Sequence, residues 1–294
     1  MPRGSTEDLT ALDERVKALV AMRPSHAELL EFCGALLKEQ LKARKRLHGE
    51  AFSADIEGEF QEGETPPLLF GKEIPLELES AKGLFRSLRG LAKKQNRVLR
   101  KSVDEIDKAM RTRRIDLGRL LGEMTLSQTP YTDEVSSSLG LSRDVLVFLA
   151  RASIQPFMEE LALHLAAGQD HRDWRKGICP ICGSPPIMSE LSGEEGRRMW
   201  ICSLCGYRWR GLRLGCPFCG REDPQAHRYL FVEGDDTVRV DVCDECGRYI
   251  KTLDSSKMDR KVFPLLEYVG TLHLDVLAQK EGYQRGSMPF LEIG

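Results

Sequence analysis

The sequence lacks a long apolar segment and a strong excess of charge of either sign. Its longest wholly apolar run, residues 145–150, is far shorter than the roughly 20 residues that cross a bilayer, so we expect no membrane insertion. The 294 residues carry 43 basic and 45 acidic side chains, and a net charge of −2 provides no general attraction for nucleic acid. The first residues contain no apolar signal core, and the expected location is therefore cytoplasmic.

Signatures of common enzymes are also missing. The sequence contains no phosphate-binding glycine loop and no G-x-S-x-G elbow. Its histidines are scattered singly, and we interpret them as ordinary side chains: His26, His48, His164, His171, His227 and His273. Among these, His227 alone falls near a cysteine cluster. We therefore predict that the protein is not an enzyme and has no catalytic residue.

What the sequence does contain is a dense group of cysteines. The exception among the nine is Cys33, which lies on an apolar helical stripe and is expected to be a small core residue. The others form four C-x-x-C-G elements, here called knuckles, between positions 179 and 246. Because the cytoplasm keeps thiols reduced, metal ligation is predicted ahead of disulfides. The predicted metal ligands are Cys179, Cys182, Cys202, Cys205, Cys216, Cys219, Cys243 and Cys246.

The spacing of the knuckles predicts two four-cysteine sites. Each knuckle provides two thiolates, a tetrahedral site needs four, and the glycine that follows is expected to adopt a positive φ. Nineteen residues separate the first two knuckles and twenty-three separate the last two, and each interval contains a hairpin pattern. Interleaved pairing of the knuckles and thioredoxin-type dithiols are the alternatives. The ligands suit Zn(II) or a single iron equally, so two metal ions, Fe or Zn, are expected.

Helical patterns flank this cysteine region. Residues 1–170 predict a bundle of five or more helices, with helix starts at Ser102 and Ser142 and a kink or break at Pro156. Residues 257–294 predict a C-terminal helix and tail. The expected fold class is α plus small β metal modules: an N-terminal helical bundle, then two tandem rubredoxin-like or zinc-ribbon modules (175–256, divided into 175–214 and 215–256), then a C-terminal helix.

Two runs of charge interrupt the helical region. Residues 50–79 hold nine acidic residues against one basic, and residues 82–114 hold twelve basic against three acidic. We interpret both the acidic loop and the basic segment as solvated surface, with a basic face for an acidic partner as the alternative.

A nucleic-acid-binding zinc ribbon with a helical dimerisation domain is the alternative function. It depends on arginines that alternate with aromatic residues: Arg197, Arg198, Arg208, Arg210 and Arg213 with Trp200, Tyr207 and Trp209. Basic and acidic residues balance over residues 175–254, however, and two Zn²⁺–thiolate sites would lower the charge of this region to about −4. We therefore expect no nucleic-acid partner and interpret the aromatic residues as packing beside the sulfurs.

The cysteine frame and its flanking residues resemble the formate dehydrogenase accessory (formation) protein family. The resemblance covers residues 179–290 and rests on the four knuckles together with Tyr249-Ile250-Lys251, Leu274-Asp275 and Gly282-Tyr283-Gln284-Arg285-Gly286. The chain departs from the family pattern at Leu266-Glu267-Tyr268-Val269 and at Ser287-Met288.

The resemblance implies a cytoplasmic accessory factor that is not itself a dehydrogenase. Such a factor binds the catalytic subunit of a respiratory formate dehydrogenase and helps it become active, as a maturation chaperone does. The resemblance also implies rubredoxin-like metal sites, with the eight knuckle cysteines as ligands. A homodimer is a further expectation.

Overall fold

The structure is a computed structural model that describes residues 6–47, 67–69, 74, 78–125, 129–167, 169 and 171–287. The chain forms two compact units. The helical unit comprises residues 1–57, 69–164 and 290–294, and the sheet unit comprises residues 58–68 and 165–289. Most of the predicted acidic loop 50–79 and the end of the predicted tail lie outside the described residues.

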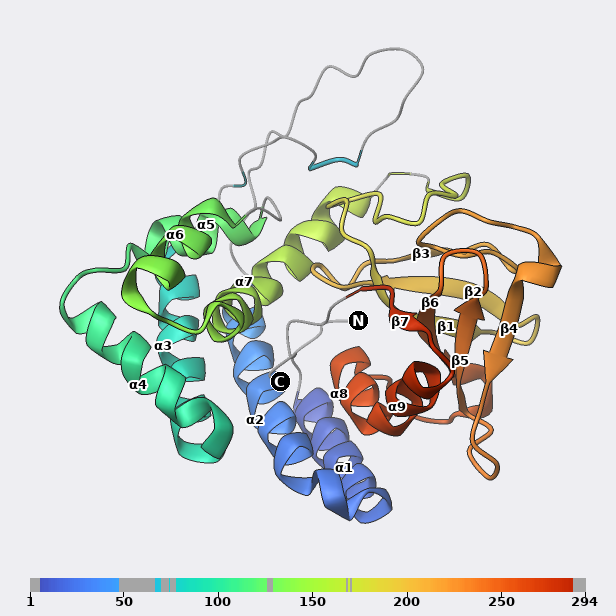
Figure 1. Ribbon diagram of the computed structural model, residues 1–294, viewed down its shortest axis with the longest axis horizontal. Coiled ribbons are helices and arrows are strands. Elements are labelled where there is room, and N and C mark those ends of the chain that lie inside the picture. The colour runs from blue at the N-terminus through green and yellow to red at the C-terminus, as the bar shows by residue number, and fades with distance from the viewer. Residues whose placement is uncertain are drawn as a thin grey trace, which may run out of the picture. The chain divides into compact units, whose positions relative to one another are not determined.

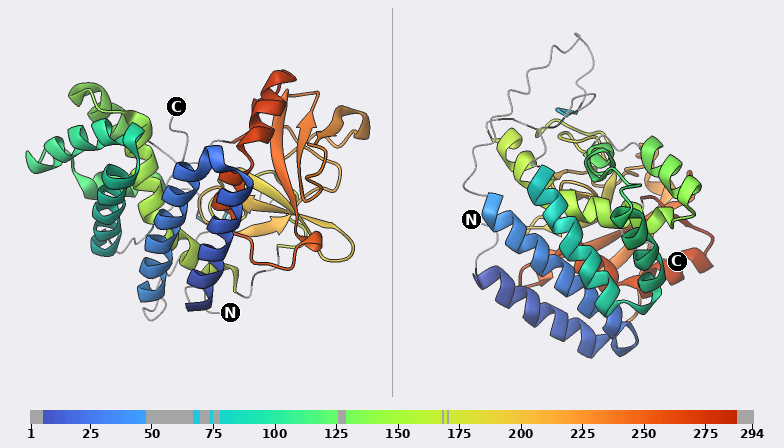
Figure 2. Two further views of the ribbon diagram at one scale, coloured as in Figure 1. Left: turned by 90° about the horizontal axis from the view of Figure 1, so that it is seen from below. Right: turned by 90° about the vertical axis from the view of Figure 1, so that its left-hand side faces the viewer.

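The described residues of the helical unit form a bundle of seven α-helices (Figures 1 and 2). These are α1 (Thr6–Met22), α2 (Ala27–Leu47), α3 (Leu78–Gln95), α4 (Arg97–Arg111), α5 (Leu117–Thr125), α6 (Pro130–Leu139) and α7 (Arg143–Ala166). Their core contains Phe32 and Phe148, whose ring centroids lie 6.1 Å apart, and the fully buried Cys33. The bundle and the core position of Cys33 confirm the predictions. Within the described part of the chain, the helices all fall short of the length and apolarity that crossing a membrane requires.

One predicted helix start is wrong. Helix α4 begins at Arg97, because the side chain of Asn96 caps it by accepting a hydrogen bond from the Leu99 amide at 3.1 Å. Ser102 therefore lies inside the helix and not at its start. An asparagine cap provides the same kind of acceptor for the first helical amides as the predicted serine cap, six residues or about 1.7 turns earlier.

The predicted start of α7 is confirmed. The Ser142 hydroxyl accepts a hydrogen bond from the Val145 amide at 3.4 Å, directly before the helix. Pro156 does not split α7, which continues to Ala166. A proline removes only one helical hydrogen bond, and Pro156 is buried among apolar neighbours that stabilise the helix on both sides of it.

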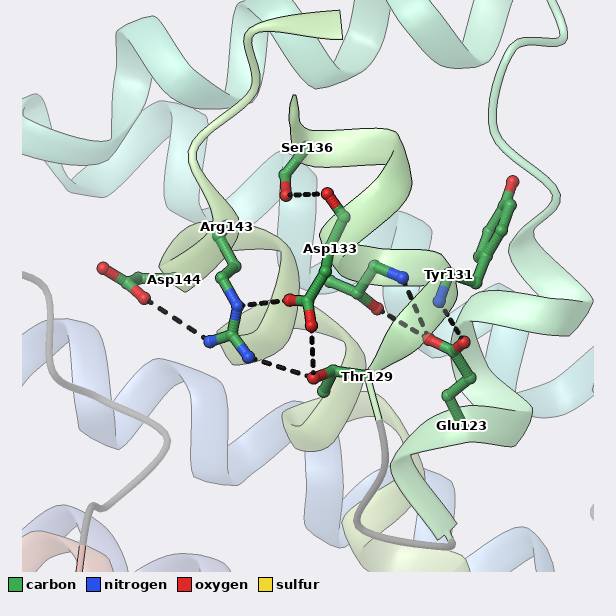
Figure 3. A network of polar contacts seen from close by, with 8 residues as sticks. Glu123, Thr129, Tyr131, Asp133, Ser136, Arg143 and Asp144 are labelled. Carbon is green, nitrogen blue, oxygen red and sulfur yellow. Dashed lines mark hydrogen bonds and ion pairs between the residues drawn. The ribbon is translucent and has the colours of Figure 1, made fainter. Parts of the chain in front are cut away.

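A side chain of the preceding helix accepts the hydrogen bonds of the free amides at the N-terminus of helix α6. The Glu123 carboxylate of α5 accepts hydrogen bonds from the amides of Tyr131 and Thr132, the latter at 3.0 Å (Figure 3). A negative charge is favourable there because of the helix dipole. Asp133 of α6 then pairs with Arg143 of α7 at 2.5 Å, so these polar contacts join three consecutive helices.

The predicted basic segment 82–114 covers most of α3 and α4. Part of its charge is neutralised within the segment, since Arg89 pairs with Asp107 at 2.9 Å and Lys93 pairs with Asp104. This pairing agrees with a solvated surface that partly neutralises itself.

The sheet unit is built on one seven-stranded sheet (Figure 1). Its strands are β1 (Pro186–Ser192), β2 (Arg197–Cys202), β3 (Arg208–Arg210), β4 (His227–Leu230), β5 (Val238–Cys243), β6 (Arg248–Asp254) and β7 (Gln284–Arg285). The order is β3-β2-β1-β6-β5-β4, with β7 beside β6. Antiparallel pairing of β1 with β2 and of β4 with β5 confirms the two predicted hairpins. The two modules share the sheet, because β1 and β6 pair in parallel between them.

The predicted C-terminal helix is divided into α8 (Pro264–Gly270) and α9 (Leu272–Lys280). Thr271 lies at the junction, where its hydroxyl donates to the carbonyl of Glu267 at 2.8 Å. Side chains from the helices and the sheet form one core, in which Val240 and Leu274 are fully buried. The two helices therefore hold residues near the C-terminus against the strands that carry the cysteines.

Candidate metal centres

The first four-cysteine cluster, called the first cluster below, gathers Cys179, Cys182, Cys202 and Cys205, whose sulfurs all lie within 4.8 Å of one another. The sulfur–sulfur distances are 3.6 Å from Cys179 to Cys205, 3.3 Å from Cys182 to Cys202 and 3.6 Å from Cys182 to Cys205. The cluster joins the knuckle before β1 to the knuckle after β2, so it closes the first hairpin at its base.

The second cluster gathers Cys216, Cys219, Cys243 and Cys246 within the same limit of 4.8 Å. Cys216 and Cys246 lie 3.7 Å apart, as do Cys219 and Cys243. The structure thus brings together the consecutive knuckles and not the interleaved alternative. The second cluster closes the β4–β5 hairpin in the way that the first closes β1–β2.

The knuckles have the tight backbone turn that their sequence predicts. Each ends on a glycine in the left-handed region, with φ of 75° at Gly183, 62° at Gly206, 73° at Gly220 and 66° at Gly247. The amide of Gly183 donates to the Cys179 carbonyl at 2.9 Å, which closes the turn and places both cysteine side chains on one side. A residue with a side chain would be strained at this φ, so the glycine in C-x-x-C-G is confirmed as a geometric requirement.

Backbone amides point at the sulfurs. The amides of Leu204 and Cys205 lie 3.4 Å from the Cys202 sulfur, and the Phe218 amide lies 3.4 Å from the Cys216 sulfur. Such N–H groups stabilise negative charge on sulfur, which is the form in which cysteine binds a metal.

The residues of each cluster fit a tetrahedral metal ion. Four sulfurs at a metal–sulfur distance of about 2.3 Å are separated from one another by about 3.8 Å, close to the observed separations. Burial raises the pKa of the Cys179 and Cys205 thiols. Burial likewise raises the pKa of Cys216. Four thiolates so close together repel one another, and a cation would remove that repulsion, so both clusters could hold metal ions.

The two clusters differ in their access to solvent. In the first, Cys179, Cys202 and Cys205 are at most 3% exposed. Residues 67 and 68 lie against it, since the Leu68 amide donates to the Pro180 carbonyl at 2.8 Å. In the second, Cys219 is exposed and Cys246 is half-buried. A metal ion in the second cluster would therefore be the more accessible of the two.

His227 lies at the edge of the second cluster without joining it. Its Nε2 lies 2.9 Å from the carbonyl oxygen of Arg221, so this ring nitrogen already has a hydrogen-bond partner. The second cluster consists of four cysteines, and the interpretation of His227 as an ordinary side chain agrees with this contact.

Sequence reasoning missed a buried group of charged side chains in the sheet unit. Lys251 of β6 and Asp275 of α9 form an ion pair at 2.6 Å, with side chains 1% and 4% exposed. Tyr249 donates to the same carboxylate at 2.8 Å, and Arg285 pairs with it at 3.3 Å. All four residues lie in the segments that carry the family resemblance, which was the signal available in the sequence.

Comparisons with known proteins find two consecutive domains. The family model described as "FdhE, central domain" matches residues 178–213, and "FdhE, C-terminal domain" matches residues 215–291. The Protein FdhE homolog of Aquifex aeolicus is 31% identical over 155 residues, which are 52% of this chain and 54% of that protein. Protein FdhE of Escherichia coli is 33% identical over 123 residues, 41% of this chain and 39% of that protein. The aligned segments thus span about half of these relatives or less.

A solved structure has the same fold. The crystal structure of the FdhE protein from Pseudomonas aeruginosa aligns with a TM-score of 0.66 over 99% of this chain and 98% of that one, at 20% identity. Sequence and fold agree with the resemblance that the knuckles suggested. Residues 178–213 and 215–291 thus match the central and C-terminal FdhE domains, and these matches indicate the formate dehydrogenase formation protein family.

Proposed function

We propose that this protein is a cytoplasmic accessory factor that binds the catalytic subunit of a respiratory formate dehydrogenase and helps it become active. The match of residues 178–213 and 215–291 to FdhE domains carries the proposal. In this role the protein acts on another protein and catalyses no formate chemistry itself. Pairing of two copies stays a prediction.

The eight cysteines would hold two metal ions that stabilise the sheet unit. Each cluster joins two knuckles that lie at the ends of one hairpin, so a bound ion would restrict both strands at once. Metal-binding free energy contributes directly to folding in small modules of this kind. Zinc would serve structure alone, whereas iron held by four thiolates can also gain or lose one electron. The exposure of Cys219 favours the second cluster as the place where such an electron would pass to or from the bound catalytic subunit, called the client below.

The surface chemistry argues against the nucleic-acid alternative. Trp200 and Trp209 are 0% and 2% exposed, so their rings cannot stack on bases. Arg198 pairs with Asp241 at 2.7 Å, and Arg208 pairs with a glutamate of β1 at 3.0 Å. These arginines already neutralise acidic groups of the sheet.

Capture of the client tests the proposal. The immobilised full chain should retain the catalytic subunit of a formate dehydrogenase, and Cys179→Ser should abolish capture because it removes a fully buried ligand of the first cluster. Cys33→Ala is the matched control, since Cys33 is a buried cysteine of the helical bundle and should be dispensable. Failure of the wild type to capture the subunit would contradict the proposal. Capture by Cys179→Ser with its metal lost would contradict the role of the metal modules.

Metal analysis separates iron from zinc. Protein purified from its native host without oxygen should contain two metal equivalents, and a thiolate-to-iron visible spectrum would identify iron. Two equivalents of zinc would exclude electron transfer through the clusters, while the proposed binding of the catalytic subunit would stand.

A further inference from the structure

A segment near the C-terminus, residues 283–286, contacts both knuckles of the second cluster. The Tyr283 hydroxyl donates to the carboxylate of Asp244, which lies between Cys243 and Cys246. Arg228 holds the same carboxylate through two hydrogen bonds of 2.9 Å. The side chain of Tyr283 is therefore bound to the fourth knuckle of the chain.

The backbone of the segment is bound there too. The Gln284 amide donates at 2.7 Å to the carbonyl of Gly247, the glycine that follows Cys246. Two residues later, the Gly286 amide donates to the Tyr249 carbonyl at 3.1 Å. These hydrogen bonds make the segment a parallel strand, β7, beside the first residues of β6.

Gly286 packs directly on the third knuckle. A Cβ atom added to Gly286 would lie 1.9 Å from the ring of Phe218, which stands between Cys216 and Cys219. The φ of Gly286 lies outside the left-handed region, so close contact with the ring, and not backbone conformation, requires glycine here.

The segment is also held from inside the unit. Arg285 pairs with the buried Asp275 at 3.3 Å, and Asp275 in turn binds Lys251 at 2.6 Å. An ion pair that is almost fully buried is costly to break on one side, so it fixes the position of Arg285 relative to β6. Side chain, backbone and buried charge all place residues 283–286 over the second cluster.

We propose that residues 283–286 are an outer support of the second metal centre, so that docking of this segment and metal binding at the second cluster stabilise each other. The inference rests on the proposed metal occupancy and not on the identity of the client. Groups that orient metal ligands from outside raise metal affinity, commonly by 10-fold to 100-fold. By thermodynamic linkage, a metal that binds the oriented cysteines must favour the docked segment to the same extent.

The first cluster should depend on this segment much less. The next residue, Ser287, donates to the carbonyl of Pro186, which is the register partner of Cys202. This single hydrogen bond at the start of β1 contrasts with the contacts that residues 283–286 make with both knuckles of the second cluster. A client that displaced the segment would therefore loosen the second metal ion in preference to the first.

Gly286→Ala in the full, metal-loaded chain tests the inference, with Gly90→Ala as its control. A Cβ at Gly90 meets open space in α3. After addition of a chelator, alkylation of the newly released thiols is followed by mass spectrometry, which reports each cluster separately in one sample. In Gly286→Ala we expect Cys216 and Cys219 to be alkylated about 10-fold faster than in the wild type, with a smaller change in the first cluster. In Gly90→Ala both rates should stay unchanged.

A second substitution connects the effect to the ring contact. Phe218→Ala makes room for the added Cβ, so Gly286→Ala should accelerate metal release much less in that background than in the wild type. If Gly286→Ala does not fold, Tyr283→Phe removes only a hydroxyl and should still accelerate release from the second cluster.

Equal acceleration at both clusters, or an unchanged rate at the second cluster in a folded variant, would overturn the inference. A wild type that binds fewer than two metal equivalents would overturn the metal proposal itself and the inference with it. Client capture has no part in the assay, so a failure of the accessory function stays distinguishable.

Discussion

Replacement of Asp275 by asparagine should strongly destabilise the sheet unit. The Asp275 carboxylate is buried and accepts hydrogen bonds from Lys251 at 2.6 Å and from Tyr249 at 2.8 Å. Arg285 pairs at 3.3 Å with Oδ1 of Asp275, the oxygen that also accepts from Tyr249. Asparagine keeps the shape of the side chain and removes the negative charge, so two cations would share a buried site without their anion.

The expected loss is about 3–5 kcal/mol in the free energy of unfolding, the usual result of removing one partner from a buried ion pair. The Tyr268 carbonyl, 2.7 Å from the Lys251 nitrogen, remains as an acceptor but brings no negative charge.

The free energy of unfolding should also depend on pH, and differently in the wild type and in Asp275→Asn. Burial lowers the pKa of Lys251 to about 8, against the attraction of Asp275. Between about pH 8 and the normal lysine pKa near 10.4, the unfolded chain binds more protons than the folded protein, so the stability of the wild type rises with pH. In Asp275→Asn this rise should begin below pH 8, because the folded lysine has lost its anion.

Denaturant unfolding followed by tryptophan fluorescence measures this effect in the metal-loaded protein. All three tryptophans, at positions 174, 200 and 209, belong to the sheet unit, so the signal reports that unit. Glu195→Gln is the control, since the Glu195–Arg197 pair is exposed and should contribute less than about 1 kcal/mol. A loss below 1 kcal/mol in Asp275→Asn, or a pH profile that matches the wild type, would refute the reasoning.

Three further predictions concern metal, thiols and helices. Chelation should change tryptophan emission while most helical circular dichroism persists, because the clusters lie in the sheet unit; loss of both signals together would contradict this. In metal-loaded protein, limited alkylation read by mass spectrometry should label the exposed Cys219 before Cys182. Cys33 should be labelled only after unfolding, because burial raises the pKa of the Cys33 thiol to about 12. Early labelling of Cys33 would contradict its burial. Glu123→Ala should lower the free energy of unfolding of the helical unit by about 1–2 kcal/mol, because the amides at the N-terminus of α6 lose their acceptor. Denaturant unfolding followed by circular dichroism measures this loss, and an unchanged midpoint would refute the capping role of Glu123.

The parts of the site that were predictable are those encoded in short segments of sequence. A C-x-x-C-G turn is complete within five residues, so the spacing alone predicted the left-handed glycines. Hairpins of about twenty residues are also local, and the strand-like segments next to the turn residues 193–196 and 233–236 located them correctly. The pairing of consecutive knuckles follows from these hairpins, since each brings its own two ends together.

The contacts that the sequence did not reveal join distant segments. Parallel pairing of Met188 with Lys251 links strands more than sixty residues apart, and nothing in either strand specifies its partner. Lys251 and its partner Asp275 are 24 residues apart, so no local pattern in the sequence indicates that α9 will place a carboxylate against this lysine. The start of α4 was mislocated because Asn96 and Ser102 are both good caps, and the packing of the helix decides between them.

The difference between the two clusters follows from what packs on them and not from their own sequences. All the knuckles have the same five-residue pattern, yet three cysteines of the first cluster are almost completely buried while Cys219 of the second is exposed. Residues 67 and 68 lie against the first cluster, whereas the side chain of Tyr283 and one short strand lie against the second. Because β1 and β6 join both hairpins in one sheet, an ion in the buried first cluster would stabilise strands that also position the second. In the proposed accessory role, an ion in the first cluster would support the sheet permanently while an ion in the second responds to the bound catalytic subunit, a division of labour that two independent modules would not provide.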